Sequence, residues 1–143
     1  MNILLTNKQK IAQFSLIFKN LKNISTDVEM HVSEKGIYIQ GMDTGHVCLF
    51  EVEIKEYWFD EFNNDTKCRL GINCEIIHKI INCKEEHQTI SLKTTTGDKL
   101  FVKLSPREGQ NGITKQFELP LIDIDSELLE VPAVDYDADI EIV

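Results

Sequence analysis

The sequence lacks the features that mark secreted and membrane-spanning proteins. No apolar run approaches the ~20 residues that a membrane-spanning helix needs. The apolar run near the N-terminus ends at Thr6 and is too short for a signal peptide. The cysteines lack the spacing of a disulfide framework: Cys48, Cys68, Cys74 and Cys83. We therefore expect an intracellular protein with reduced, mostly buried thiols and no membrane partner.

Each end of the chain lacks charge of one sign. Residues 1–26 contain four lysines and no acid, whereas residues 116–143 contain nine acids and no lysine or arginine. The whole chain carries a net charge of −9. A uniformly acidic surface would repel nucleic acid, but a basic N-terminal segment allows binding on one face of the molecule.

Hydrophobic periodicity predicts a duplicated domain. With 143 residues, 42% of them hydrophobic, the chain can form one folded core. Helical spacing appears over residues 8–22 and 73–83, where Asn73 is a plausible N-cap. The expected strands are 2–5, 27–33, 37–40, 47–54, 67–72, 89–95, 99–104 and 113–121, with a polar loop at 55–65 whose aromatic residues fold back onto the domain. The order strand, helix, three strands occurs twice, which predicts an α+β domain with two helices on one face of antiparallel sheets.

The polar faces of both predicted helices would point the same way. On the first helix Lys8, Lys19 and Lys22 surround Ser15, opposite the apolar face. On the second, four polar residues oppose the isoleucines: Glu75, His78, Lys79 and Asn82. Such lysines suit phosphate contact without base readout, although an ordinary solvated helix face has the same pattern.

The turn within residues 40–50, QGMDTGHVCLF, could be a catalytic, metal or docking site. Asp43 and His46 could form an acid–base pair. However, no nucleophile, glycine-rich phosphate loop or second carboxylate accompanies them, so we do not expect an enzyme.

Two further motifs have competing interpretations. The pairs Cys74/His78 and Cys83/His87 could supply four zinc ligands, which would make the chain a small zinc-stabilised interaction domain. Against this, Cys74 lies toward the apolar side of its helix and Cys83 suits a buried thiol. The acidic segment 122–134 carries large apolar residues that fit either a partner groove or an ordinary linker.

Three stretches resemble one family: GIYIQGMDTGHVCLFEVEI (36–54), GINCEIIHKIINC (71–83) and LIDIDSELLEVPAVDY (121–136). They are similar to the N-terminal half of proliferating cell nuclear antigen (PCNA), the eukaryotic-type DNA sliding clamp. The resemblance implies a clamp domain at 1–121, an interdomain connecting loop at 122–135 and the start of a truncated second domain at 136–143. It further implies a DNA polymerase processivity factor that docks replication and repair enzymes, uses no cofactor and performs no chemistry.

The family also implies partners and a location. Three full-length subunits would close a ring around double-stranded DNA, with a clamp loader and DNA polymerase among the partners. The location would be the nucleus, or the site of viral DNA replication for a viral protein. Without a second domain, we expect this chain to be a monomer or an edge-paired dimer.

Site residues carry over by position, as the resemblance implies. The partner-peptide pocket would contain Met42, His46, Val47, Leu49, Leu129, Val131, Pro132 and Tyr136. The DNA-facing residues would be Lys8, Lys19, Lys22, Lys79 and Lys84. The subunit-interface strand would present Ile113, Lys115, Phe117 and Leu119. Ser15 and Asn82 stand where the family often has lysine, which predicts weak DNA affinity.

Overall fold

The computed structural model describes residues 1–95, 97–125 and 127–130. Its helices are α1 (Lys8–Ile24), the short 3-10 helix η1 (Glu56–Trp58) and α2 (Cys74–Asn82). Its strands are β1 (Asn2–Leu5), β2 (Asp27–Ser33), β3 (Gly36–Met42), β4 (Leu49–Lys55), β5 (Glu61–Asn63), β6 (Cys68–Asn73), β7 (Gln88–Lys93), β8 (Lys99–Pro106) and β9 (Lys115–Pro120). Among the described helices, none is long and apolar enough to cross a membrane.

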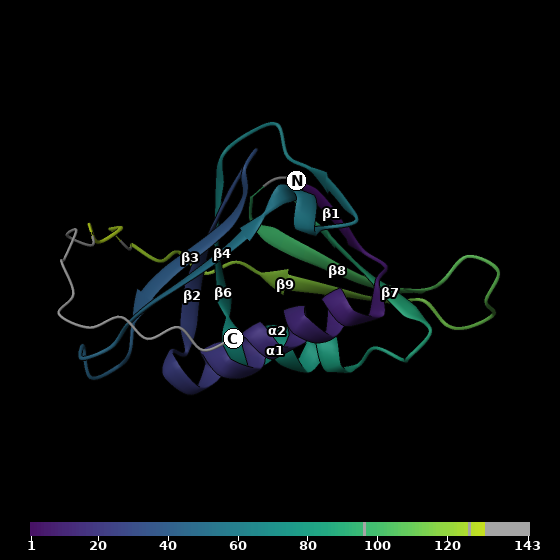
Figure 1. Ribbon diagram of the computed structural model, residues 1–143, viewed down its shortest axis with the longest axis horizontal. Helices are drawn as coiled ribbons and strands as arrows, with labels where there is room; N and C mark the ends of the chain where they lie inside the picture. Colours follow the sequence, from purple (N-terminus) through teal and green to yellow (C-terminus); the bar gives the residue numbers. More distant parts are fainter. Residues whose placement is uncertain (96, 126, 131–143) are drawn as a thin grey trace, which may run out of the picture.

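The strands form two antiparallel sheets, and both helices lie side by side along one side of them (Figure 1). The five-stranded sheet has the order β5-β1-β7-β8-β9, and the four-stranded sheet has the order β4-β3-β2-β6. The predicted duplication is present as β1-α1-β2-β3-β4 and β6-α2-β7-β8-β9. The first strand of each half pairs with the other half, because β1 joins β7 and β6 joins β2. The two halves therefore share one interlocked core.

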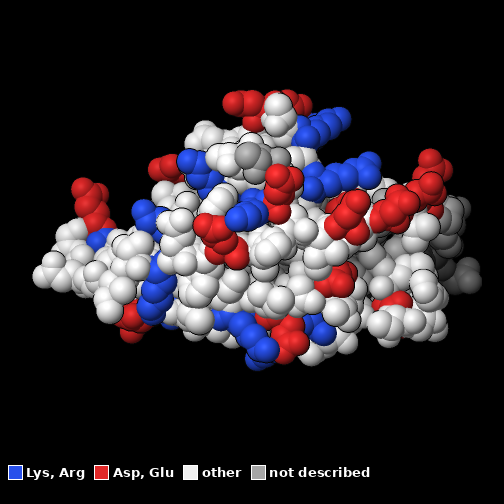
Figure 2. All heavy atoms as spheres, turned by 180° about the vertical axis from the view of Figure 1, so that it is seen from behind, with Lys and Arg blue, Asp and Glu red and all other residues white. Residues whose placement is uncertain are grey.

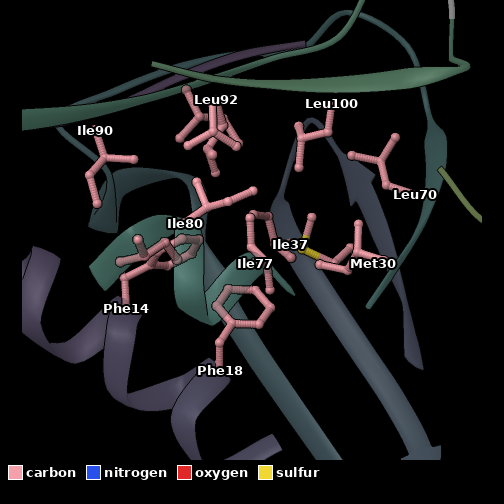
Figure 3. Packing of buried hydrophobic residues seen from close by; sticks show 14 of the residues in the cluster. Phe14, Phe18, Met30, Ile37, Leu70, Ile77, Ile80, Ile90, Leu92 and Leu100 are labelled. Atoms are coloured by element: carbon pink, nitrogen blue, oxygen red, sulfur yellow. The ribbon is translucent and has the colours of Figure 1, made fainter. Parts of the chain in front are cut away.

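Side chains from both helices and both sheets point toward one another in this core (Figure 3). Phe14 and Phe18 of α1 pack edge to face, with their ring centroids 5.2 Å apart. Ile77 of α2 is buried beside them, as the helical periodicity predicts. Ile76 departs from that pattern, since it was expected on the apolar face and is 46% exposed.

The expected polar loop at 55–65 is partly ordered as η1 and β5, and β5 pairs with β1. Its Phe59 is buried as expected, whereas Tyr57 is exposed. Asp60 fastens this segment to the start of α1 by accepting hydrogen bonds from the backbone N–H groups of Thr6 (2.6 Å) and Asn7 (3.0 Å) and from Lys10 Nζ (2.9 Å). Burial opposes ionisation of Asp60, but these bonds together lower the pKa of its carboxyl.

Candidate docking and nucleic-acid surfaces

The segment that follows β9, called the connector here (residues 121–125 and 127–130), contacts β6, the outer strand of the four-stranded sheet. The N–H of Ile122 donates to the carbonyl of Gly71 on β6 at 2.8 Å. A Cβ at Gly71 would stand only 1.9 Å from the Ile122 oxygen, so this close approach requires glycine. This contact brings the connector from the five-stranded sheet onto the four-stranded sheet.

A second contact holds the connector at Leu129. The Gln40 side chain on β3 donates from Nε2 to the Leu129 carbonyl at 2.9 Å and accepts at Oε1 from the Leu129 N–H at 2.7 Å. Gln40 is 9% exposed, so this pair of bonds is largely shielded from water. Nothing local in the sequence reveals this role, because the two residues are 89 positions apart.

The turn between β3 and β4 is organised by Asp43. Its carboxylate accepts hydrogen bonds from the backbone N–H groups of Cys48 (2.7 Å), Val47 (2.8 Å) and Gly45 (3.0 Å). The bonds from Cys48 and Val47 are the main reason that the pKa of Asp43 lies below its usual value. His46 takes a positive φ of 54°. The Asp43 carboxylate therefore stabilises the turn, and the turn exposes the neighbouring side chains to solvent.

Three of the described pocket residues, Met42, Leu49 and Leu129, lie at the outer face of the four-stranded sheet, whereas His46 and Val47 lie in the turn. Gln40 and Met42 are two residues apart on β3 and therefore share one face, and Leu49 of β4 pairs directly with Met42. Leu49 is 37% and Leu129 48% exposed, which leaves apolar surface open beside the turn. Val47 is 88% exposed and belongs to the turn, because β4 starts only at Leu49. The predicted pocket residues Val131, Pro132 and Tyr136 lie outside the described residues.

A separate apolar groove was not anticipated from the sequence. It lies between α1 and the outer strand β4, with a volume of about 450 Å³. Its lining includes Leu16, Tyr57 and Trp58. Leu16 is 50% and Tyr57 77% exposed, so part of this lining faces solvent.

The polar faces of the two helices meet. The Ser15 hydroxyl donates to Asn82 Oδ1 at 3.2 Å, and Asn82 Nδ2 lies 3.1 Å from His78 Nε2. His78 is only 8% exposed, although the helical wheel placed it on the solvent face. The reason is that α2 packs against α1 as well as against the sheets. Burial lowers the pKa of His78, and nearby Lys22 and Lys19 lower it further.

The predicted DNA-facing lysines differ in their surroundings. Lys8 pairs with Glu86 at 2.7 Å and Lys79 with Glu75 at 2.8 Å. Lys8 and Lys84 line a groove between the two helices, together with the Ser15 and Asn82 side chains. Acidic and basic residues are likewise interspersed over the face of the molecule in Figure 2. The helix surface therefore offers lysines whose charge is partly offset by neighbouring glutamates.

The predicted subunit-interface strand corresponds to β9, the outer strand of the five-stranded sheet, which pairs with β8. Ile113 precedes the strand and is 69% exposed, and its carbonyl accepts a bond from Gln88 Nε2 at 2.6 Å. Leu119 is buried in the core, so its side chain faces inward. Lys115 Nζ forms an ion pair with Glu85 Oε1 at 2.8 Å. What β9 offers a partner is mainly its backbone edge.

The four candidate zinc ligands are not assembled into a site. Within the described residues, no group of three or more histidine, cysteine or acidic side chains could hold a metal ion. Cys74 is buried, which raises the pKa of its thiol to about 11. Cys83 was expected to be buried and is exposed, because α2 ends at Asn82 and Cys83 caps it. His78 is held by Asn82.

Two helices below two antiparallel sheets, built from a duplicated unit, define the fold class of DNA-clamp domains. The family model described as "Proliferating cell nuclear antigen, N-terminal domain" matches residues 5–128, and the chain belongs to this family. It is 30% identical over 128 residues to proliferating cell nuclear antigen 2 of Plasmodium falciparum and 29% identical over 132 residues to proliferating cell nuclear antigen of Dictyostelium discoideum. These alignments cover 86% and 90% of this chain, but 48% and 51% of the relatives. The chain thus spans about half the length of the curated relatives it matches.

Proposed function

We propose that this chain provides the N-terminal half of a DNA sliding clamp subunit, which acts as a DNA polymerase processivity factor. The observation that carries the proposal is the family match over residues 5–128 in a fold whose two helices lie side by side on one side of the sheets. Three full-length subunits would place such helices around double-stranded DNA. Encirclement, rather than tight affinity, then keeps the protein on DNA.

The DNA-facing surface in this proposal is the helix pair. Lys19, Lys22 and Lys79 would contact phosphates without reading bases, and Lys8 and Lys84 would contribute from the groove between the helices. The offsetting glutamates Glu75 and Glu86 favour weak and salt-sensitive contact.

The partner-facing surface is the turn at Asp43 together with the connector at Leu129. Polymerases and other enzymes with clamp-interacting motifs would dock there, and a clamp loader would act on the full ring. The chain would itself perform no chemistry. The eukaryotic relatives favour a nuclear location. The zinc-stabilised alternative is not favoured, because its four ligands are not assembled among the described residues.

Calorimetric titration with a helical clamp-interacting peptide, carrying one glutamine and two aromatic residues, tests the docking surface. The Leu129→Asp variant should lose at least about 2 kcal/mol of binding free energy, because a charge would be buried against the peptide. Leu128→Asp is the matched control, since Leu128 lines a pocket with His31 and Arg69 that is separate from the proposed peptide pocket. Equal affinity of the Leu129→Asp variant and the parent would remove the pocket assignment.

A further inference from the structure

A row of polar side chains on the outer face of the four-stranded sheet ends at the connector. Gln40 of β3 and Glu51 of β4 are directly paired across the strands, and Tyr38 lies diagonally from Glu51. The Tyr38 hydroxyl donates to Glu51 Oε1, and Gln40 Nε2 donates to the same oxygen at 3.2 Å. Gln40 in turn holds both backbone groups of Leu129.

The donor and acceptor groups in this row favour one orientation of the Gln40 carboxamide. An ionised carboxylate only accepts hydrogen bonds, so Glu51 can bond the Gln40 side chain only through its amide nitrogen. The two Leu129 bonds already place Oε1 on the N–H and Nε2 on the carbonyl, and the bond from Nε2 to Glu51 stabilises the same orientation of the carboxamide. Without Glu51 the Gln40 side chain would keep its two bonds to Leu129 but would lose the contact that holds its NH₂ group from the side of β4. Tyr38 holds the carboxylate in place from the other side.

We propose that Tyr38, Glu51 and Gln40 act as a positioning relay that holds Leu129 in the docking surface. None of the three lies in the predicted peptide pocket, so partner affinity would depend on residues outside that pocket. The effect on partner affinity rests on the proposed docking function. The fixed position of Leu129 rests on the hydrogen bonds alone.

Hydrogen exchange of the Leu129 amide tests the relay directly, because this N–H donates to Gln40 Oε1. We expect its exchange to accelerate about tenfold in Gln40→Ala and several-fold in Glu51→Ala. Glu118→Ala is the matched control, since Glu118 is likewise an exposed strand glutamate that pairs with a lysine, Lys99, but it lies in the five-stranded sheet. The buried amide of Ile90 reports global unfolding and should exchange as in the parent. Unchanged Leu129 exchange in both relay variants would overturn the proposal.

Peptide titration then tests the link to docking. Affinity should fall several-fold in Glu51→Ala and should recover in part in Glu51→Gln, whose carboxamide oxygen can still accept from Gln40. Tyr38→Phe should have a smaller effect of the same sign. Faster Leu129 exchange in Glu51→Ala with unchanged peptide affinity would refute the link between relay and docking. A parent chain that binds no peptide would contradict the proposed function, whereas the exchange result would still decide the relay.

Discussion

The Ser15 hydroxyl of α1 donates a hydrogen bond to Asn82 Oδ1 of α2 at 3.2 Å, which joins the two helices through their polar faces. The other end of the same carboxamide, Asn82 Nδ2, lies 3.1 Å from His78 Nε2. In this arrangement the contact is a hydrogen bond when the imidazole is neutral and carries its proton on Nδ1, so that Nε2 accepts from Asn82. Ser15 and Asn82 thus hold the two helices together at the centre of the helix surface, and the lysines lie around them.

The pKa of His78 should lie below its usual 6.5, first because of burial and then because of Lys22 and Lys19. Replacing Lys22 by Ala should raise it, and an NMR titration of the ring protons measures both values. Below pH 6.5 the unfolded chain binds a proton that the folded chain resists, so folding stability should fall as the pH drops through this range. A pKa that is unchanged in the Lys22→Ala variant would contradict the placement of the two side chains.

The double replacement of Lys19 and Lys22 by Ala should weaken binding to double-stranded DNA of any sequence. If two phosphate contacts are lost, the slope of log affinity against log salt should become shallower by about 2. Fluorescence anisotropy over a series of salt concentrations gives this slope. The double replacement of Lys93 and Lys103 is the control, because these exposed lysines lie on the far face of the five-stranded sheet. Equal slopes for the two double variants would rule out the helix face as the DNA surface.

The backbone edge of β9 should make the chain associate at high concentration. We expect a monomer in dilute solution and edge-to-edge dimers as the concentration rises, because an outer strand carries unpaired N–H and C=O groups. Pro120 limits the length of the pairing, since it has no N–H to donate. Light scattering over a concentration series measures the change. A stable trimer at micromolar concentration would show that another surface closes the ring.

Replacing Asp60 by Asn should destabilise the fold by about 1–2 kcal/mol at neutral pH, because a neutral oxygen replaces the charged acceptor of the Thr6 and Asn7 N–H groups and the bond to Lys10 is lost. The lowered pKa of Asp60 means that this stabilisation is complete above pH 3.8 and declines as the pH falls further. Urea denaturation at neutral and acid pH should therefore show the difference between parent and variant narrowing in acid. The exposed Asp65→Asn variant should unfold like the parent at both pH values.

Periodicity predicted the elements whose structure depends on near neighbours in the sequence. Both helices appear close to their expected bounds, and Asn73 caps α2 by accepting from the Ile76 N–H at 3.0 Å. The duplicated order of strands is also confirmed. These features follow from a repeat of 3.6 or 2 residues, which a single sequence displays.

The features that the sequence did not predict depend on distant partners. β5 pairs with β1, which lies near the N-terminus, and Gln40 bonds Leu129 across 89 positions. His78 was misplaced because a helical wheel shows one buried face, whereas α2 is covered by the sheets and by α1. The turn motif pointed to His46 as a functional side chain, but it gave no sign that Asp43 organises the turn through backbone N–H groups.

The connector is bonded to the sheet at two separate points, by Ile122 at Gly71 and by Leu129 at Gln40. If partners dock beside Leu129 as proposed, they would meet a backbone segment that its two bonds to Gln40 already hold in place. Most of the ordering cost of association then falls on the partner's own chain. Cross-linking a docking peptide into its helical form should therefore increase affinity chiefly by making the entropy of binding less unfavourable, with little change in enthalpy.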